Sequence, residues 1–460
     1  MKGMSFMRKY FGTDGIRRIA NTELTPELVY KVAKSGAYVF SKHTNHVPTI
    51  LIGRDTRLSG TLIESAMVAG FLSYGANVKL LGVIPTPAVA YLTRKLKADA
   101  SVVISASHNT FEFNGIKFFS NKGMKIPDSL EEEIEEVMES GKIEELTAVR
   151  DKIGVYENCE DLIDEYVYFF RKNFDTNMDK INRDGFIIGL DTANGATYKV
   201  AEKIFTSLGI RYKIINNNPN GININDKCGS THIEFLQKYV VENKLNMGFA
   251  YDGDGDRCLA VDEKGNLIDG DIIMAIIAKY LKEKEKLSKN TIVATVMSNL
   301  GLHKYAEKNG LKLEQTQVGD RYVLEKMLKE DYNLGGEQSG HIILLDYNPT
   351  GDGILTSVML IQAVLESNKK ASELADIIKI YPQVLVNAKV DSDKKYDYDK
   401  VPEIQEAIKK LEKEFDGNGR ILIRPSGTEP LVRVMIEGEN QQEITKKAKE
   451  MAKLIEENMK

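Results

Sequence analysis

Residues 49–81, TILIGRDTRLSGTLIESAMVAGFLSYGANVKLL, contain the pattern that decides the fold. A run typical of a buried strand, Thr49 to Gly53, is followed by a polar loop and an amphipathic helix that reaches about Tyr74. Gly75 follows that helix, as glycine often does at a helix end, and a second strand runs from Asn77 to Leu81. Strand, helix, glycine and strand in this order predict a βαβ unit.

The same order of elements occurs twice more along the chain. The further copies comprise strands at Phe186–Leu190 and Tyr212–Ile215 around a helix that ends at Gly209, and strands at Thr291–Thr295 and Lys312–Gln315 around a helix from about Leu300 to Gly310. Three copies predict an α/β protein with three related mixed α/β domains, each with a mostly parallel sheet. Ligands in such sheets bind beyond the carboxyl ends of the strands, where the polar loops fall.

After Glu366 the pattern changes, and it predicts a smaller C-terminal α+β domain from roughly Ala371. Its expected strands are Tyr381–Val390, Arg420–Ile423 and Leu431–Ile436, and its expected helices are Val401–Phe415 and Gln441–Met459. The domain boundaries predicted for the whole chain are 1–153, 154–258, 259–370 and 371–460. The charged segments 129–152 and 281–290 are predicted to be solvated helices or connectors without chemistry.

Composition excludes several classes of protein. The 460 residues include 42% hydrophobic and 28% charged residues, which is ordinary for a globular chain of three or four domains. The net charge is −5 and no basic stripe is present, so a nucleic-acid partner is not expected. No apolar run reaches the roughly 18 residues of a membrane helix, and the N-terminus lacks the apolar core of a secretory signal. Three scattered cysteines predict neither a disulfide framework nor a zinc site, so we expect a cytoplasmic protein.

The first candidate for chemistry is Ser107, within residues 101–119, SVVISASHNTFEFNGIKFF. A short apolar strand leads into a polar loop, and an Asn-Gly turn leads into a second strand that brings Lys117 back beside the loop. This order suits a nucleophilic hydroxyl, although a serine-rich turn without chemistry is an alternative. A Ser-His-Asp hydrolase fits less well, because the G-x-S-x-G elbow is absent. In an extended loop, moreover, the adjacent side chains of Ser107 and His108 would point to opposite sides.

The second candidate is a metal site in residues 247–261, MGFAYDGDGDRCLAV. Asp252, Asp254 and Asp256 stand at alternate positions, and their repulsion is relieved by a hard divalent cation, Mg²⁺ ahead of Ca²⁺. An EF-hand is the alternative, with Glu263 at its twelfth position. It fails at its sixth position, where the sharp turn needs glycine and the chain has Arg257, and its flanks are strand-like.

Two further glycine-containing loops fit a phosphorylated sugar. Residues 333–342, NLGGEQSGHI, place hydroxyl-binding side chains among glycines, and QVGDRY at residues 317–322 has the same character. Residues 424–433, RPSGTEPLVR, offer hydroxyls and two arginines between strands, a combination that suits a phosphate dianion, while a simple hairpin is the alternative. A serine nucleophile, a Mg²⁺ loop, a polyol loop and a phosphate loop together predict phosphoryl transfer on a phosphorylated sugar.

Four motifs in order, SASHN with the distal Lys117, DGDGDR, GGEQSGH and RPSGTEP, resemble the α-D-phosphohexomutase family from Phe11 to about Gly438. The resemblance implies four domains around a central cleft, each of which contributes one loop. It implies an isomerase that transfers phosphate within a hexose phosphate, through a phosphoserine at Ser107 and a sugar bisphosphate. A hinged fourth domain would help to retain that intermediate.

The resemblance also assigns roles to individual residues. The catalytic residues would be Ser107, His108, Lys117 and Arg17; the metal ligands would be Asp252, Asp254, Asp256 and the phosphorylated Ser107; and the substrate-binding residues would be Glu337, Ser339, Arg257, Arg424, Ser426, Gly427, Thr428 and Arg433. Which of Arg17, His108 and Lys117 moves the proton is left open. The implied cofactors are one Mg²⁺ per active site and a sugar 1,6-bisphosphate as activator and intermediate. The implied partner is a phosphorylated hexosamine, and a homodimer is an assembly that the sequence leaves open.

Substrate choice within the family depends on fewer residues. Gln338, the opening FGTDGIR and the stretch NGININDKCGSTH at residues 220–232 resemble the branch that acts on glucosamine phosphates in amino-sugar metabolism, which supplies cell-wall precursors. The phosphomannomutase/phosphoglucomutase branch is the alternative, and a non-catalytic, metal-dependent sugar-phosphate binding protein is a remote one. Thr110 replaces the usual proline after SHN, which could loosen the loop, and Arg18 replaces the usual glycine after GIR, which adds a cation near the cleft.

Overall fold

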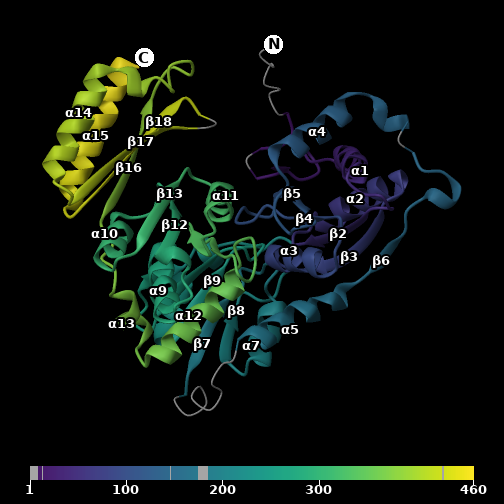
Figure 1. Ribbon diagram of the computed structural model, residues 1–460, viewed down its shortest axis with the longest axis horizontal. Coiled ribbons are helices and arrows are strands. Elements are labelled where there is room, and N and C mark those ends of the chain that lie inside the picture. The colour runs from purple at the N-terminus through teal and green to yellow at the C-terminus, as the bar shows by residue number, and fades with distance from the viewer. Residues whose placement is uncertain (1–8, 13, 146, 175–184, 427–428, 460) are drawn as a thin grey trace. The chain divides into compact units, whose positions relative to one another are not determined.

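The computed structural model of the protein describes residues 9–12, 14–145, 147–174, 185–426 and 429–459 (Figure 1). Its contacts divide the chain into two compact units, Met1–Val296 with Glu314–Asp376 and Met297–Leu313 with Ile377–Lys460. The described residues form three mixed sheets flanked by helices and one small antiparallel sheet. The predicted fold class, three α/β domains and a smaller C-terminal α+β domain, is confirmed.

The first sheet has the strand order β1-β5-β4-β2-β3-β6. Its inner strands β4, β2 and β3 run parallel with the edge strand β6, whereas β5 is antiparallel to β4 and β1. The elements are β1 (Ile16–Ile19), α1 (Pro26–Ser41), β2 (Thr49–Arg54), α2 (Gly60–Tyr74), β3 (Asn77–Val83), α3 (Thr86–Lys95), β4 (Ala100–Ile104), β5 (Phe113–Ser120), α4 (Asp128–Glu139) and β6 (Tyr156–Asn158). The βαβ unit predicted from residues 49–81 is therefore β2, α2 and β3.

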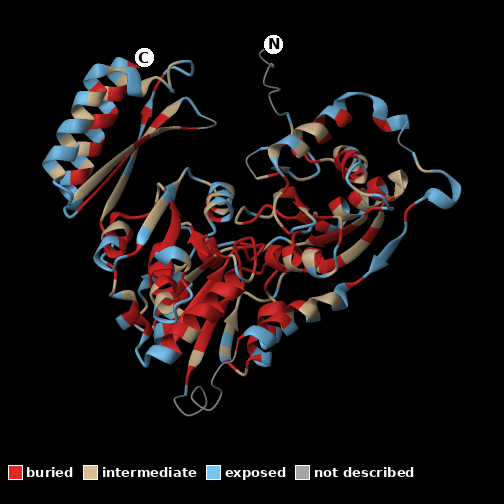
Figure 2. Cartoon of the chain, in the orientation of Figure 1, coloured by how far each residue is buried: buried red, intermediate tan, exposed pale blue. Residues whose placement is uncertain are grey.

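The second and third sheets repeat this arrangement with fewer strands, in the orders β11-β10-β9-β7-β8 and β13-β12-β14-β15. Their elements are α5 (Ile163–Asn173), β7 (Ile187–Asp191), α7 (Val200–Ser207), β8 (Arg211–Ile215), α8 (Glu234–Glu242), β9 (Met247–Tyr251), β10 (Cys258–Asp262), β11 (Leu267–Ile268), α9 (Gly270–Glu283), β12 (Thr291–Thr295), α10 (Leu300–Lys308), β13 (Lys312–Thr316), α11 (Asp320–Glu330), β14 (Leu334–Gly336), β15 (Ile342–Leu344), α12 (Gly353–Ser367) and α13 (Ala371–Ala375). Figure 2 shows that α9 and α12 are buried along most of their length. Apolar residues on nearly every side of these helices account for that burial.

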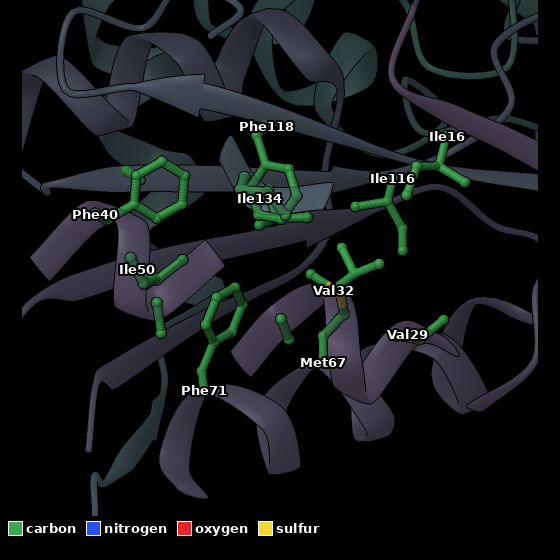
Figure 3. Packing of buried hydrophobic residues seen from close by; sticks show 14 of the residues in the cluster. Ile16, Val29, Val32, Phe40, Ile50, Met67, Phe71, Ile116, Phe118 and Ile134 are labelled. Atoms are coloured by element: carbon green, nitrogen blue, oxygen red, sulfur yellow. The ribbon is translucent and has the colours of Figure 1, made fainter. Parts of the chain in front are cut away.

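The core of the first domain lies between its sheet and the helices α1 and α2. Phe40 and Val32 of α1 pack with Phe71 of α2 and with Phe118 of β5 in one buried cluster (Figure 3). The two helices approach closely at Gly70, where a Cβ would come within 2.6 Å of both the Ala33 Cβ and the Tyr30 carbonyl oxygen. Glycine at this position therefore allows the close contact of α1 with α2 on which the core depends.

Helix α4 departs from the solvated connector predicted for residues 129–152. Its residues Ile134 and Val137 are buried in the first core, and Glu135 is only 3% exposed. Glu135 accepts hydrogen bonds from the backbone N–H groups of Lys9 (2.8 Å), Tyr10 (2.7 Å) and Phe11 (2.7 Å). The prediction of a solvated segment was wrong for α4, because Glu135 accepts hydrogen bonds from the N-terminal backbone and does not face solvent.

Replacing Glu135 by alanine is expected to reduce the free energy of unfolding of this domain by about 1–3 kcal/mol, because three backbone donors would lose their acceptor. Urea unfolding followed by circular dichroism measures this change. Glu136 is exposed on the same helix and provides the matched control, since its replacement by alanine is expected to change stability by less than about 0.5 kcal/mol. Equal effects of the two substitutions would contradict the assignment.

The C-terminal unit has a three-stranded antiparallel sheet in the order β16-β18-β17. Its elements are β16 (Gln383–Lys389), α14 (Pro402–Phe415), β17 (Gly419–Pro425), β18 (Leu431–Gly438) and α15 (Gln441–Asn458), and α10 also groups with it. The start of α10 is fixed there because the N–H of Leu300 donates to the buried carboxylate of Glu437 at 3.1 Å. The helix of the third predicted βαβ copy thus groups with the C-terminal sheet.

His303 of α10 makes the stability of this unit depend on pH. Burial and the nearby Arg420 lower the pKa of His303 to about 4, and an N–H of Arg420 approaches His303 Nε2 at 3.2 Å. Between about pH 4 and the ordinary pKa near 6.5, the unfolded chain binds a proton at this residue that the folded chain does not. Stability is therefore expected to fall as the pH is lowered from 6.5 to 4. Urea unfolding at pH 7 and pH 5 measures the loss, which should be smaller in His303→Gln, where no ring can titrate.

Candidate active site

The loop between β4 and β5 carries Ser107, which is 2% exposed and has a φ of 51°. Because this left-handed conformation turns the chain, Ser107 Oγ lies 3.4 Å from Nδ1 of His108. The expectation that these neighbouring side chains point to opposite sides is wrong, since it assumed an extended loop. Burial, with help from Arg257 and Arg17, lowers the pKa of His108 to about 4.

Ser107 Oγ lies closer to the aspartate motif than to His108. Its hydroxyl donates to Oδ2 of Asp252 at 2.7 Å, across a separation of 145 residues in sequence. The motif forms the connection between the antiparallel strands β9 and β10, as the strand-like flanks predicted. Glu263 does not join it, because its carboxylate accepts from Ser372 Oγ at 2.6 Å and from Ser372 N at 3.1 Å. These positions exclude the EF-hand alternative.

Asp252, Asp254 and Asp256 each turn a carboxylate oxygen toward one point, and these oxygens lie within 4.8 Å of one another. Oδ1 of Asp254 and Oδ1 of Asp256 are buried and have no hydrogen-bond partner among the described residues. Burial, with the neighbouring carboxylates, raises the pKa of Asp252 well above its usual range. A hard divalent cation would satisfy the orphaned oxygens and neutralise the cluster, so the donor set fits Mg²⁺.

Lys117 neutralises part of this negative charge. Its ammonium group lies 3.1 Å from Asp254 Oδ2, 3.2 Å from Asp14 Oδ2 and 3.9 Å from Asp256 Oδ2, and its side chain is 2% exposed. Burial alone would lower the pKa of Lys117, but the three carboxylates raise it well above its ordinary value, so the group stays charged. Arg17 adds a second cation, donating to Asp14 Oδ2 at 2.8 Å and to Asn109 Oδ1 at 3.2 Å.

The predicted sugar-binding loop lies between β14 and β15. Glu337 accepts from the N–H of Gly319 at 3.2 Å, and Ser339 is exposed. The buried His341 connects this loop to the aspartate motif, with Nδ1 at 3.6 Å from Asp256 Oδ2. Arg257 is half-buried beside the same motif, and within the described ranges its buried Nε has no hydrogen-bond partner.

Residues that the sequence did not single out complete the surroundings. Lys125 forms ion pairs with Asp14 and with Asp320, the latter at 2.7 Å, and Arg321 pairs with Asp128. Asp320 and Arg321 are the first residues of α11 and lie in the stretch QVGDRY, for which only a turn of sugar-binding character was predicted. Thr86, at the start of α3, donates to Asp254 Oδ2 at 2.8 Å. A long-range ion pair leaves no local sequence signal, and therefore no pattern could have identified these contacts.

The predicted phosphate loop is described within the C-terminal unit alone. Arg424 of β17 and Arg433 of β18 are cross-strand partners, and Arg433 Nη2 lies 3.4 Å from Ser426 Oγ. Burial and Arg433 lower the pKa of Arg424, and Nε of Arg433 is buried with no acceptor in the part of the chain that the structure describes. Two adjacent guanidinium groups with an unused donor suit an anion. The predicted ligands at positions 427 and 428, Gly427 and Thr428, lie outside the described residues.

Comparison with known proteins identifies the family. Family profiles described as phosphoglucomutase/phosphomannomutase match in order: α/β/α domain I over residues 8–145, domain II over 164–265, domain III over 269–381 and the C-terminal domain over 385–454. The chain belongs to the phosphoglucomutase/phosphomannomutase family.

Similar members of this family include two proteins described as phosphoglucosamine mutase. The one from Ruminiclostridium cellulolyticum is 54% identical over 450 residues, which cover 98% of this chain and 99% of the relative. The one from Clostridium tetani is 55% identical over 454 residues, which cover 99% and 100%. Both matches extend over essentially the full length, so the matched region spans the positions of all four motifs in this chain.

Solved structures of more distant phosphoglucomutase/phosphomannomutase relatives share the fold. A putative phosphomannomutase from Thermus thermophilus superimposes with a TM-score of 0.78 at 22% identity, covering 97% of this chain and 98% of the other. A phosphoglucomutase described as parafusin from Paramecium gives a TM-score of 0.77 at 18% identity, covering 97% and 95%. At these identities the likeness concerns the fold alone.

The two departures from the family pattern have local structural explanations. Thr110 stands where proline is usual, and its carbonyl accepts a hydrogen bond from Arg57 Nη1 at 2.7 Å, so the loop is held without the proline. Arg18 donates to the backbone oxygen of Lys9 at 2.7 Å and lies over the ring of Tyr10. Its charge is therefore engaged by the N-terminal segment.

None of the helices in the described residues is long and apolar enough to cross a membrane. The three cysteines are buried, and they form no disulfide with one another.

Proposed function

We propose that this protein interconverts glucosamine 6-phosphate and glucosamine 1-phosphate, with Ser107 as the phosphoryl carrier. The observation that carries this proposal is the 2.7 Å contact between Ser107 Oγ and the aspartate cluster, because it unites a nucleophilic hydroxyl with a site suited to a divalent cation. Full-length relatives at 54–55% identity described as phosphoglucosamine mutase support the choice of sugar.

The reaction has two phosphoryl transfers. In the first, the P–O bond to Ser107 Oγ breaks as a new P–O bond forms to the O1 hydroxyl of glucosamine 6-phosphate, and the hydroxyl proton leaves to a base. The product is glucosamine 1,6-bisphosphate. After this intermediate turns end for end, its 6-phosphoryl group returns to Ser107 Oγ, O6 takes up a proton, and glucosamine 1-phosphate is released. The same bisphosphate, supplied from outside, would recharge a dephosphorylated Ser107.

The residues around Ser107 have separate parts in these transfers. Lys117 and Arg17 hold fixed positive charge near the transferring group, which favours a transition state with charge spread over the phosphoryl oxygens. Nδ1 of His108 lies 3.4 Å from Ser107 Oγ, close enough for His108 to be a candidate for the group that accepts the proton of the sugar hydroxyl. Mg²⁺, held by Asp252, Asp254, Asp256 and the phosphorylated serine, would supply charge neutralisation at the phosphoryl oxygens.

Substrate binding is assigned to the two remaining loops. Glu337 and Ser339 would contact sugar hydroxyls, and Arg257, with its unused Nε donor, would contact a phosphate. In the C-terminal unit, Arg424, Ser426 and Arg433, together with positions 427 and 428, would bind the phosphate that is not being transferred. Location in the cytoplasm and assembly as a homodimer remain predictions.

Two measurements test the proposed function. Turnover of glucosamine, glucose and mannose 6-phosphates at equal concentration should favour glucosamine, whereas preference for glucose or mannose would support the alternative branch. Phosphopeptide mass spectrometry of the purified protein should find phosphate on Ser107, and incubation with glucosamine 6-phosphate should move that phosphate to sugar. Phosphate found only at other residues, with no mutase turnover, would leave the non-catalytic binding protein as the explanation.

A further inference from the structure

The loop that carries Ser107 accepts hydrogen bonds from one fully buried arginine, Arg57. Arg57 is 1% exposed, and its guanidinium donates to the carbonyl oxygens of Ser107 (2.9 Å), Asn109 (2.9 Å from both Nη atoms) and Thr110 (2.7 Å). These carbonyls belong to the irregular loop between β4 and β5, outside the strand ladder, and that of Thr110 also accepts from the N–H of Phe113 at 3.3 Å. Arg57 thus supplies hydrogen-bond donors to the carbonyls of Ser107 and Asn109, which the strand ladder does not reach.

A second donor reaches the same oxygens from another part of the chain. Nδ2 of Asn225 lies 2.9 Å from the carbonyl oxygen of Ser107 and 2.9 Å from that of Asn109. Asn225 is 3% exposed, and its side chain also packs near Gly253 of the aspartate motif. It lies in the stretch NGININDKCGSTH, to which the mechanism above gives no part. Arg57 and Asn225 therefore share two carbonyl oxygens: that of Ser107 accepts one hydrogen bond from each residue, and that of Asn109 accepts from both Nη atoms of Arg57 and from Asn225 Nδ2.

The arginine is itself fixed in place. Arg57 Nε donates to Asp55 Oδ2 at 2.9 Å, and the fully buried Asp55 also accepts from Ser105 Oγ at 2.5 Å. Ser105 Oγ in turn accepts from the N–H of Ser107 at 3.0 Å. Both the N–H and the carbonyl of Ser107 are therefore held by the same buried network. Such a network can maintain a left-handed φ at a serine, which the backbone alone disfavours.

We propose that Arg57 and Asn225 are positioning residues that together clamp the Ser107 loop, so that the Ser107 hydroxyl stays directed at Asp252. This inference rests on the proposed function of Ser107 as the phosphoryl carrier. Neither clamp residue bonds to the Ser107 hydroxyl or to the carboxylates of Asp252, Asp254 and Asp256, so loss of the clamp should misplace the hydroxyl while leaving the substrate-binding loops intact. The kinetic consequence is a fall in kcat with little change in KM.

The first test compares Arg57→Met and Asn225→Ala with the control Arg54→Met. Arg54 is a half-buried arginine at the end of β2, three residues before Arg57, and it pairs with Glu64 at 3.2 Å. The control therefore removes a similar charge without contacting the carbonyls of the Ser107 loop. We expect kcat to fall about 100-fold in each clamp variant, KM to change by less than about threefold, and the control to keep its activity. A loss of the same size in Arg54→Met, or a loss that appears in KM, would overturn the proposal.

Because both residues hold the same oxygens, their effects should not add. The double variant Arg57→Met/Asn225→Ala is expected to be no more than about tenfold slower than either single variant, whereas independent effects would multiply to about 10⁴-fold and overturn the shared clamp. In Arg57→Ala, millimolar guanidinium should restore part of kcat, and tetramethylammonium at the same concentration should not. Equal restoration by both cations would also overturn it.

A measurement without catalysis separates the clamp from the proposed function. Hydrogen exchange of peptides that cover residues 104–113 should be faster in both clamp variants than in the unaltered protein, with exchange in β2 and β12 unchanged. Unchanged exchange in the loop would overturn the clamp even if the protein proves to be a mutase. Faster exchange would support it even if the unaltered protein fails to turn over glucosamine 6-phosphate. If Arg57→Met does not fold, hydrogen exchange of the same peptides in Asn225→Ala tests the clamp.

Discussion

Replacing Ser107 by alanine is expected to lower kcat for the mutase reaction by about 10⁴-fold or more, because the variant has no oxygen to carry the phosphoryl group. The hydroxyl removed is the one that donates to Asp252 at 2.7 Å, so the loss should leave the surrounding charges in place. Initial rates of conversion of glucosamine 6-phosphate measure the effect, with glucosamine 1,6-bisphosphate added so that unphosphorylated enzyme is not the cause of a low rate.

The matched control is Ser101→Ala in β4, six residues before the nucleophile. Ser101 is fully buried and accepts from Thr93 Oγ1 at 2.6 Å, so its replacement also removes a buried hydroxyl from the same segment. That variant should lose about 1 kcal/mol of stability and retain its turnover. A Ser107→Ala protein with more than about a tenth of normal activity would contradict the role of Ser107 as phosphoryl carrier.

The fold could be predicted because each helix and strand is specified by a pattern among residues that are neighbours in the sequence. Residues 49–81 contain a strand pattern, a helix pattern and a terminating glycine, and β2, α2 and β3 form within these residues. The predicted strand Thr291–Thr295 has the same bounds as β12. Each of these elements depends on periodicity over a few residues, and burial of its apolar face then selects the layer in which it packs.

The candidate site was predictable only where a motif is short. Asp252, Asp254 and Asp256 lie within five residues, so their convergence follows from spacing, and the orphaned oxygens agree with it. The left-handed φ of Ser107 was not predictable, because it depends on Arg57 and Asn225, which lie about 50 and 118 residues away in sequence. Sequence patterns describe neighbours along the chain, whereas this conformation is imposed by neighbours in space.

The same reason explains why the prediction for residues 129–152 was wrong and why the packing of α10 was not predicted. Segment 129–152 is rich in glutamate, and its pattern indicated solvent, but Glu135 accepts from the N-terminal backbone about 125 residues away. The helix α10 follows β12 in a regular βαβ pattern, yet its first turn donates to Glu437 of the C-terminal sheet. In both cases a long-range hydrogen bond to a buried carboxylate decides where the helix packs.

The second large effect is expected at the predicted metal site, where Mg²⁺ binding can be measured without following the mutase reaction. Asp254→Asn removes one of three buried carboxylates and is expected to weaken Mg²⁺ binding by at least about 100-fold, since loss of a mere outer-shell partner often costs about 10–100-fold. Mg²⁺ should raise the midpoint of thermal unfolding in the unaltered protein, because a ligand of the folded state stabilises it, and chelation should remove both this rise and the turnover.

The control for Asp254 is Asp262→Asn, a buried aspartate of the same hairpin that accepts from the N–H groups of Lys264 and Asn266 at 2.8 Å and lies outside the cluster. This variant should be less stable than the unaltered protein but should show a normal shift with Mg²⁺, whereas Asp254→Asn should show almost none. The two outcomes separate a lost ligand from a weakened hairpin. A normal Mg²⁺ shift in Asp254→Asn would mean that the orphaned oxygens of this cluster do not hold the cation, and the site for it would have to lie elsewhere.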